Sequence, residues 1–376
     1  MIIDYVVVGA GLTGATIARH LVDAGRKVMV VERRSHTGGN VHDFIHDSGI
    51  RVHTYGPHYF RTNSKRIWNF VNRFAAFQPF AAVVMTEVHG RLVNWPVPAS
   101  YISSVSGANW EPVFRGVPSN FEEACLAEMP REVYETFIRG YTEKQWGVPA
   151  HTLTPGLAKR IEIRVNGDPR LCLHRWQGLP RGGYEHFVRE LLRGIPVILN
   201  CDYLFNREVL RAKQQVIFTG PIDEFFGYDL GRLEYRAQRR EHTYEPTKSY
   251  HQPVIQVNNP GKAAGPHIRT IEWKHLLPPD IARNIRGTLL TTETPFTPIN
   301  PAEYEYPFPD ERNQRLYRLY RARAEGLSNT VIAGRLGEYR YYDMDQAIAR
   351  AIHIAEQLLG RGNVNPARAV AKTTTA

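Results

Sequence analysis

The sequence predicts an α/β fold in which a Rossmann-like domain carries an inserted helical domain and an antiparallel β-sheet domain. Residues 5–8 form a valine-rich run bounded by glycine, which is typical of a buried parallel strand. A helical stretch at 13–24 and a second apolar run at 27–31 follow, and together they complete a β-α-β unit. Farther along, residues 241–301 are rich in β-branched residues and proline, which favours sheet.

The first turn of the β-α-β unit carries three glycines with distinct tasks. Gly9 permits the tight turn, Gly11 lets the backbone approach a pyrophosphate, and Gly14 allows the helix to pack closely on the strand. Glu32 ends the second strand, where a carboxylate can accept hydrogen bonds from a ribose. The glycine pattern alone is a weak indication, but with both strands, the helix and the acid in order it predicts a dinucleotide site.

The segment after the second strand narrows the dinucleotide to FAD. Residues 38–40 read Gly-Gly-Asn, and comparable segments pack against FAD in flavoproteins of the amine oxidase and glutathione reductase types. The chain returns with a Gly-Gly turn at 180–184, a helix, a strand at 197–200 and a run at 215–221, which resembles a second visit to a flavin domain. No second strand-linked glycine motif for NAD(P)H follows, so electrons would have to come from outside the protein.

These patterns divide the chain into alternating segments of three domains. The predicted segments are the first part of the FAD-binding domain at 1–77, a helical substrate domain at 78–150, a mobile loop with the first part of the sheet domain at 151–184, the second part of the FAD-binding domain at 185–240, the antiparallel sheet domain at 241–311, the third part of the FAD-binding domain at 312–365, and a disordered tail at 366–376.

Composition limits the class of protein and its partners. Lysine and arginine exceed aspartate and glutamate by 47 to 37, a net charge of +10, so phosphates, nucleic acid and anionic membranes are candidate partners. Three cysteines without CxxC spacing exclude a disulfide framework and a zinc ribbon, and no ligand spacing predicts a metal. No window approaches about eighteen consecutive apolar residues, and the N-terminus begins with a strand-like run. We therefore expect a soluble cytoplasmic protein without integral membrane contact.

Four further blocks resemble one known family. They read HTYGPHYF at 53–60, GYTEKQWG at 140–147, TGPID at 219–223 and GRLGEYRYYDMD at 334–345. With the FAD motifs, they make nearly the whole chain similar to the prokaryotic UDP-galactopyranose mutases, flavoenzymes that interconvert the pyranose and furanose forms of a nucleotide sugar. The resemblance implies a discontinuous FAD domain, a helical substrate lobe, a layer of antiparallel sheet and a homodimer.

The chemistry of ring contraction fits this resemblance. The anomeric bond to the nucleotide must break and the sugar ring must open and reclose, without net redox change. The sequence has no metal motif, no acid/base carboxylate pair and no GxSxG elbow, which favours the cofactor as the covalent catalyst. In the family, reduced FAD attacks the anomeric carbon through N5. The resemblance further implies that residues 165–176 form a mobile loop that closes over the substrate and delivers Arg164 from its root.

The resemblance assigns the site residues by their places in the matching motifs. Arg164 and Arg269 match two arginines that bind the diphosphate, which suits guanidinium forks because no metal is implied. The other expected catalytic residues are His58 against the flavin ring, Tyr341 and Asp343. The expected substrate-binding residues are Phe137, Tyr141, Trp146, Tyr306 and Arg61. The expected FAD-binding residues are Gly9, Gly11, Gly14, Glu32, Arg33, Gly39, Asn40, Tyr55, Thr219, Gly220, Arg335 and Met344.

Several positions depart from the family pattern, and they gather on the substrate side. Arg61 stands where a second histidine is usual, Pro98 replaces an asparagine, Leu171 replaces a tyrosine that contacts the diphosphate, and Glu305 replaces one tyrosine of a Tyr-Tyr-Pro segment. Such changes alter which sugar hydroxyls find partners, and an unpaired buried polar group costs about 1 to 3 kcal/mol. We hypothesise a nucleotide sugar other than UDP-galactose, still on a pyrimidine nucleotide because the aromatic pocket is retained.

Two other function classes share some of these sequence features with the mutase. An FAD-dependent oxidoreductase of the amine oxidase type shares the glycine and return motifs, but the blocks at 144–146 and 341–345 favour the mutase. A nucleic-acid binder is suggested by charge alone, and no RRM, KH or helix-turn-helix pattern is present. We therefore expect a nucleotide-sugar substrate and no nucleic-acid partner.

Overall fold

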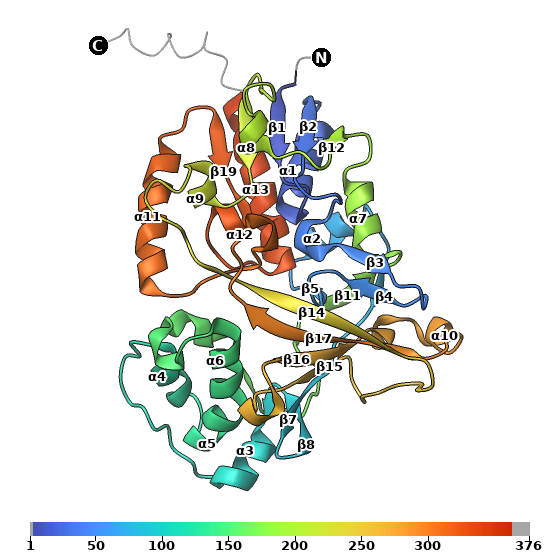
Figure 1. Ribbon diagram of the computed structural model, residues 1–376, viewed down its shortest axis with the longest axis vertical. Helices are drawn as coiled ribbons and strands as arrows, with labels where there is room; N and C mark the ends of the chain where they lie inside the picture. Colours follow the sequence, from blue (N-terminus) through green and yellow to red (C-terminus); the bar gives the residue numbers. More distant parts are fainter. Residues whose placement is uncertain (1–2, 363–376) are drawn as a thin grey trace.

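The computed structural model describes residues 3–362 and shows three regions along its long axis (Figure 1). A parallel sheet flanked by helices lies at the end where the two termini are found, a long antiparallel sheet crosses the middle, and a helical lobe lies at the far end. The predicted tail at 366–376 and the last residues of the segment 312–365 lie outside the described residues. The predicted fold class is confirmed.

The parallel sheet has the strand order β12-β2-β1-β13-β19. Its strands are β1 (Tyr5–Val8), β2 (Val28–Val31), β12 (Val197–Ile198), β13 (Gln215–Phe218) and β19 (Thr330–Ile332). All of its neighbouring strands are parallel, and Tyr5 stands between Val28 and Gln215 in register. The chain goes from β1 to β2 on one side and later adds β13 on the other side of β1, so the strand order reverses at β1. Ligands of such sheets bind in the crevice at the carboxyl ends of the strands at this point.

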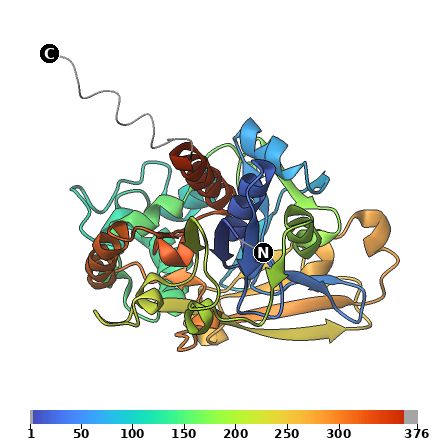
Figure 2. The same cartoon turned by 90° about the horizontal axis from the view of Figure 1, so that it is seen from above.

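Helices from distant parts of the chain cover this sheet. Residues 12–18 of helix α1 (Leu12–Asp23) are all buried, and α13 (Met344–Gly362) packs against α1. Seen from above, the two helices lie side by side although more than three hundred residues separate them (Figure 2). The other helices of this region are α2 (Lys65–Val71), α7 (Gly183–Leu191), α8 (Tyr203–Asn206), α9 (Ile222–Phe225), α11 (Glu311–Glu325) and α12 (Gly334–Gly337). The Rossmann-like region is thus assembled from three visits of the chain.

The central sheet has the strand order β18-β14-β17-β16-β15-β7-β8 and is antiparallel except between β15 and β7. Its strands are β7 (Val84–Val88), β8 (Arg91–Trp95), β14 (Tyr235–Glu245), β15 (Gln256–Asn258), β16 (Arg269–Glu272), β17 (Thr288–Phe296) and β18 (Tyr306–Pro307). Helix α10 (Pro279–Ala282) lies in the connection before β17. Residues 84–95 therefore extend the sheet, whereas we predicted a helical segment from residue 78. The reason is the alternation of buried Val84, Thr86 and Val88, which is a strand pattern.

The helical lobe begins after these strands. It contains α3 (Ala99–Ser106), α4 (Phe121–Leu126), α5 (Arg131–Val133), a π-helical turn η2 (Tyr134–Arg139) and α6 (Gly140–Trp146). Its own apolar core includes Phe121, Tyr134 and Phe137. At Gly140 a Cβ would overlap the carbonyl oxygen of Pro260, so the lobe docks on the loop after β15 with its bare backbone. This close approach sets the lobe beside the central sheet.

Short elements connect the three regions. The small sheets pair β3 (Asp43–Ile45) with β4 (Arg51–His53), β9 (Val97–Pro98) with β10 (Ile163–Arg164), and β11 (Trp176–Pro180) with both β5 (Phe60–Thr62) and β6 (Phe77–Pro79). The 3₁₀ turns are η1 (Gly39–Val41), η3 (Ala150–Thr152), η4 (Pro155–Arg160), η5 (Lys262–Ala264), η6 (Trp273–Leu276) and η7 (Pro301–Glu303). Within residues 3–362, no helix combines the length and the apolar character that a membrane crossing requires.

Asp223 provides a test of this packing by its pH dependence. It lies in α9, fully buried, and its Oδ2 accepts a hydrogen bond of 2.9 Å from the Leu233 amide. Burial raises its pKa from 3.8 to about 6. The folded protein therefore binds a proton that the unfolded chain releases, so this group costs stability as the pH rises from about 4 through 6.

We expect Asp223→Asn to be more stabilising, or less destabilising, at pH 8 than at pH 4, by up to about 3 kcal/mol. The amide keeps the oxygen that Leu233 needs but never becomes charged. Urea unfolding at the two pH values measures the difference, with Asp47→Asn in an exposed turn as the control. An equal effect of Asp223→Asn at both pH values would contradict the buried titration.

Candidate active site

A cavity of about 170 Å³ lies at the carboxyl ends of β1, β2 and β13. Its walls come from the first turn, the segment after β2, the segment after β13, α12 and the start of α13. The predicted FAD-binding residues that line it are Gly9, Gly11, Gly14, Glu32, Arg33, Gly39, Asn40, Thr219, Gly220, Arg335 and Met344, and His58 lies there too. The structure therefore gathers nearly all of the predicted cofactor residues around one cavity, although they come from four parts of the sequence.

Bare backbone forms the floor of this cavity. Gly9 has φ +103°, and a Cβ there would overlap the Thr219 hydroxyl. A Cβ on Gly14 would overlap the Gly9 carbonyl oxygen, and one on Gly39 would lie 2.9 Å from the Gly11 Cα. Helix α1 begins at this floor without a side-chain cap, so its first amide groups can donate to a pyrophosphate. A cradle that any side chain would fill fits a dinucleotide.

Glu32 and Arg33 stand side by side but make different contacts. The Glu32 carboxylate accepts hydrogen bonds from the amides of Ala10, at 2.8 Å, and Arg34, at 2.9 Å, which fix it at the end of β2. Arg33 instead donates both arms of its guanidinium to Glu224, at 3.0 and 2.8 Å. Glu32 is thus fixed by two amides in the cavity wall, while Arg33 closes that wall through an ion pair.

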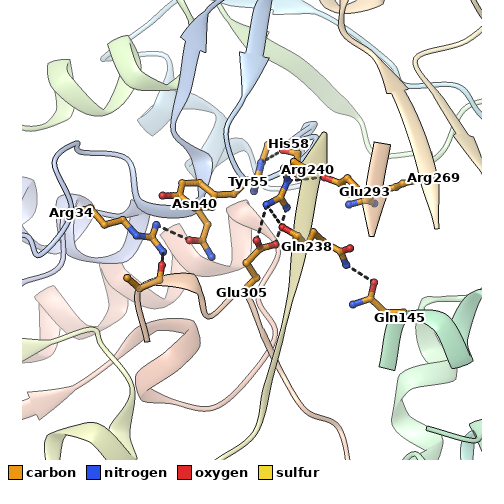
Figure 3. Close-up of polar contacts among 12 residues, drawn as sticks. Arg34, Asn40, Tyr55, His58, Gln145, Gln238, Arg240, Arg269, Glu293 and Glu305 are labelled. Atoms are coloured by element: carbon orange, nitrogen blue, oxygen red, sulfur yellow. Dashed lines mark hydrogen bonds and ion pairs between the residues drawn. The ribbon is translucent and has the colours of Figure 1, made fainter. Parts of the chain in front are cut away.

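Tyr55 lies outside the cavity lining, in a polar cluster that the sequence did not predict. Arg34 lies over the Tyr55 ring at 4.4 Å and donates to Asn40 Oδ1, at 2.9 Å, and to the Ala302 carbonyl, at 2.5 Å (Figure 3). This arginine ties the segment after β2 to the chain after β17. The cofactor cavity is therefore closed on that side by a chain segment far away in sequence.

His58 is held neutral at the edge of the cavity. Its Nδ1 lies 2.7 Å from the Gly56 carbonyl oxygen, which can only accept, so Nδ1 carries the proton and Nε2 carries a lone pair. Its own amide donates to His53 Nδ1 at 3.0 Å. Desolvation and the nearby Arg335 lower the pKa of His58 to about 3. The cavity therefore has an acceptor, and no imidazolium, at this position.

Arg269 sits in a row of charged side chains on the central sheet. Its Nε donates to Glu293 at 2.5 Å, and the second oxygen of Glu293 accepts from Arg240 at 2.8 Å (Figure 3). Arg240 also donates to both oxygens of Glu305, at 2.8 and 2.9 Å. Arg240 and Glu293 were missing from the predicted site, and only knowledge of the strand register, which pairs them, could have revealed them.

A stack of aromatic and basic side chains lies beside this row. The rings of Tyr306 and Tyr341 are stacked with centroids 6.2 Å apart, and Arg335 lies over both, at 5.8 and 5.0 Å. Arg160 covers the Tyr341 ring at 3.9 Å. These tyrosines line a second, larger groove of about 1360 Å³. Tyr342 lines both the cofactor cavity and the groove, so the two share a wall, and Arg335 of the cavity lies against the groove's two tyrosines.

Arg61 and Asp343 form an ion pair next to this stack. Arg61 Nη2 lies 3.2 Å from Asp343, and the Tyr341 hydroxyl donates to the same carboxylate at 3.0 Å. Burial would raise the pKa of Asp343, but Arg61 and Arg160 outweigh it and lower that pKa. Asp343 thus remains ionised, and it is paired with Arg61, another residue that we predicted to belong to the site.

The aromatic residues of the helical lobe are less accessible than we predicted. Phe137 and Trp146 are only 3% and 8% exposed, and they pack edge-on against Tyr101 and Phe308 in the lobe core. Tyr141 is partly exposed, and burial raises its pKa although Arg269 opposes the shift. Of the three, Tyr141 is therefore the one that the structure places beside the charged row.

Arg164 is a buried arginine on β10 whose guanidinium is only partly paired. Its side chain is 2% exposed, and Nη2 contacts the Arg170 carbonyl at 3.2 Å and Glu162 at 3.4 Å. Within residues 3–362, Nε and Nη1 have no hydrogen-bond partner. The charges of Arg61 and Arg164 both lower the pKa of the Cys172 thiol, although burial has the larger effect and raises it. The two arginines therefore lie near the same loop residue. A buried guanidinium with free donors fits an anionic ligand.

The fold and the glycine cradle first define a class: this is a Rossmann-like dinucleotide-binding protein. A family model described as NAD(P)-binding Rossmann-like domain matches residues 7–74. A second model, described as UDP-galactopyranose mutase, matches residues 136–341, more than half of the chain. The chain belongs to the UDP-galactopyranose mutase family, whose members are isomerases. The predicted family and enzyme class are confirmed, and together with the Rossmann-like domain they indicate a flavin cofactor.

Curated relatives resemble the chain over almost its full length. It is 31% identical to the dTDP-fucopyranose mutase of Escherichia coli, over 93% of this chain and 97% of that protein. It is 32% identical to the probable UDP-galactopyranose mutase of Klebsiella pneumoniae, over 95% of this chain and 94% of that protein. A crystal structure of reduced UDP-galactopyranose mutase matches with a TM-score of 0.75 and 17% identity, covering 97% of this chain and 98% of the other.

Oxidases share the fold more distantly. A solved putrescine oxidase variant matches with a TM-score of 0.60 and 12% identity over 95% of this chain and 99% of that chain, which shows a common fold only. An L-amino-acid oxidase of Sistrurus catenatus edwardsii is 23% identical over 75% of this chain and 55% of that protein. The amine oxidase alternative thus reflects fold kinship, whereas the family match lies with the mutases.

The neutral state of His58 can be tested directly. Because its surroundings oppose protonation, we expect the His58 imidazole to remain uncharged from pH 5 to pH 9. NMR of ¹⁵N-histidine-labelled protein, assigned with a His58→Gln variant, measures the titration. In the urea-unfolded protein the same ring should titrate near about 6.5. A native transition between pH 5 and 8 would contradict the enclosed, neutral ring.

Proposed function

We propose that the protein is a flavin-dependent, non-redox isomerase that interconverts the pyranose and furanose forms of a nucleotide sugar and works with FAD in its reduced state. The observation that carries this proposal is the shared wall: Arg335 lines the dinucleotide cavity and lies over the rings of Tyr306 and Tyr341 in the adjoining groove. A sugar in that groove would lie next to the reactive ring of the cofactor. The family to which the chain belongs supports the reaction class.

When bound, reduced FAD would supply an electron-rich nitrogen, N5, for the anomeric carbon of the sugar. The chain would contribute binding and charge. The cradle of Gly9, Gly11, Gly14 and Gly39 would hold the pyrophosphate of FAD, and Glu32 would accept from its ribose. His58, neutral and with a free Nε2, would lie against the ring system without adding charge.

The leaving diphosphate would be held by arginines. Arg269 is fixed by Glu293 through its Nε, which leaves its two terminal nitrogens for phosphate oxygens. Arg164 would meet the diphosphate from the root of the loop at 165–176, since it is buried and has two unpaired donors among residues 3–362. Tyr306 would donate a hydroxyl hydrogen bond to the diphosphate. The Tyr341 hydroxyl, which donates to Asp343, would help to hold Asp343 and Arg61 for contacts with sugar hydroxyls. Phe137, Tyr141 and Trp146 would border the base, with Tyr141 the most accessible of them.

We further propose that the sugar differs from galactose while the nucleotide remains a pyrimidine. Two relatives of nearly equal identity bear the names of a dTDP-fucopyranose mutase and a UDP-galactopyranose mutase, so sequence identity does not favour one sugar. The side chains at the site support a different sugar: Arg61 brings an ion pair with Asp343, and Glu305 brings a carboxylate. We propose that the enzyme acts in the cytoplasm as a homodimer. We keep the predicted division into FAD-binding, helical and sheet domains, except that residues 84–95 belong to the sheet.

Turnover of nucleotide sugars by the purified protein tests the proposal. We expect the dithionite-reduced enzyme to interconvert the two ring forms of one or more UDP- or dTDP-sugars, and the air-oxidised enzyme to be inactive. Chromatography of the nucleotide sugars measures the conversion. UDP-galactofuranose serves as the reference, and fast, exclusive turnover of it would contradict the altered sugar. A substrate that bleaches the flavin without dithionite would instead support the oxidoreductase of the amine oxidase type. Catalysis by the oxidised form would refute the reduced-flavin reaction.

Arg164→Ala tests the diphosphate contact. Two charge-assisted hydrogen bonds of roughly 1.5 to 3 kcal/mol each would be lost, so we expect kcat/KM to fall about 100-fold or more while FAD stays bound. Absorbance at the flavin band measures retention. Arg170→Ala, an exposed arginine paired with Asp168 in the same loop, is the control and should change activity little. Loss of the yellow colour in Arg164→Ala, or unchanged turnover, would contradict this role.

A further inference from the structure

Arg240, Glu293 and Glu305 form a buried row with Arg269 that is larger than diphosphate binding requires. We propose that Arg240 and Glu305 are positioning residues, which act through Glu293 to fix the Arg269 guanidinium and to keep the charge of Arg240 away from the substrate. This inference rests on the proposed function, because it concerns how the same diphosphate site is set up. The four side chains are called the charge row below.

The sheet itself lines up the charge row. Arg240 of β14 is in register with Glu293 of β17, and Glu293 is in register with Arg269 of β16. Directly opposed residues on neighbouring strands hold their Cβ atoms about 5 Å apart on the same face. Three strands therefore place a positive, a negative and a positive side chain next to one another. Glu305 joins the row from the segment just before β18.

Each group in the charge row has a defined partner (Figure 3). Glu293 uses one oxygen for Arg240, at 2.8 Å, and the other for Arg269, at 2.5 Å. Arg240 uses Nε for Glu293, Nη1 for Glu305 and the Gln238 carbonyl, and Nη2 for Glu305. Because Arg240 holds one oxygen of Glu293 by a hydrogen bond, the carboxylate cannot rotate freely. Its other oxygen is therefore fixed where it accepts from Arg269.

Space around the charge row is reserved by a glycine. Gly56 has φ +86°, and a Cβ there would lie 2.6 Å from Glu293 Oε1 and 3.2 Å from Arg240 Nη2. The same residue supplies the carbonyl that fixes His58. Arg335 of the cofactor cavity donates to the Glu305 carbonyl at 3.2 Å. The charge row is thus connected, through the backbone of Glu305 and through Arg335, to the wall of the cofactor cavity.

Burial raises the pKa of Glu305, and Arg240, which donates to both of its oxygens, opposes that shift. With Glu305 ionised, the charges of the row sum to zero. Glu293 and Glu305 are fully or almost fully buried, and Arg240 is 9% exposed on its side chain. Burial would raise the pKa of Glu293, but Arg269 and Arg240 together lower it, so it stays ionised. If Glu305 lost its charge, Arg240 would keep only Glu293 as a charged partner, which it shares with Arg269, and the row would carry one unit of net positive charge. If Arg240 were lost, Glu305 would be a buried carboxylate without its partner, and Glu293 would be free to turn.

The two ends of the Arg240–Glu305 pair therefore have opposite expected effects on a diphosphate. We expect Arg240→Met to weaken binding of UDP about tenfold or more, and Glu305→Gln to strengthen it about threefold, because one unit of charge is removed or exposed near the phosphates. In both variants we expect turnover to fall about tenfold or more. In Arg240→Met the Arg269 guanidinium is no longer held in one orientation, and in Glu305→Gln the charge beside the leaving diphosphate is one unit more positive. A row that only stabilised the fold would lower the melting temperature and leave the UDP affinity unchanged.

Titration calorimetry with UDP on the FAD-loaded protein measures the affinity without turnover. The double variant Arg240→Met/Glu305→Leu removes both charges of this pair, so it leaves no unpaired buried charge that could cause misfolding. We expect it to bind UDP about tenfold more weakly, because Arg240 no longer holds Glu293. Arg51→Met is the matched control, since Arg51 pairs at 3.0 Å with the buried Asp43 elsewhere, and it should leave the UDP affinity unchanged.

Wild-type UDP affinity in Arg240→Met and in the double variant would overturn the positioning role, as would weaker binding in Glu305→Gln. These results leave the proposed function intact when the wild-type protein binds UDP and turns over sugar. Absence of UDP binding by the wild-type protein would refute the proposed pyrimidine diphosphate site and the positioning role with it.

Discussion

The site depends on one buried carboxylate. Glu293 touches Arg240 and Arg269 at once, and it is fully enclosed by the central sheet. A buried cation is tolerated only where an opposite charge and hydrogen bonds meet it, and the described residues bring together no cluster of His, Cys, Asp or Glu that could hold a metal ion. In the proposed function, arginines meet the charge of the diphosphate. Arg269 is held by the Glu293 carboxylate through its Nε, and Arg164 keeps two nitrogens without a partner among residues 3–362.

The folding of the chain explains how these groups meet. The parallel sheet ends in a glycine floor, the antiparallel sheet presents a row of charges, and Arg335 of α12 faces both the cavity and the aromatic stack. Arg34 ties the segment after β2 to Ala302, which keeps the two regions together at the cofactor side. Binding of a dinucleotide and placement of positive charge are thus properties of one junction between two sheets, rather than of either sheet alone.

The sequence carried the local parts of this arrangement. The tasks of Gly9, Gly11 and Gly14 depend on a turn that is written in consecutive residues, so the cavity floor could be predicted. The long motif around Tyr341 and Asp343 marked a second part of the site. Partners that depend on strand register could not be predicted, because Arg240 and Glu293 become neighbours only when β14 and β17 pair. Burial inside the helical lobe was missed for the same reason, since Phe137 and Trp146 meet Tyr101 and Phe308 from other segments.

The central claim is that the chain places charge while the cofactor provides the bond to the sugar. Reconstitution of the protein with reduced 5-deaza-FAD, in which carbon replaces N5, separates these two contributions most directly. We expect the UDP affinity to equal that of the FAD enzyme, because the arginines are unchanged, and the interconversion of the nucleotide sugar to be lost. Interconversion at a rate close to that of the FAD enzyme would show that a side chain of the protein, and not the flavin nitrogen, attacks the sugar.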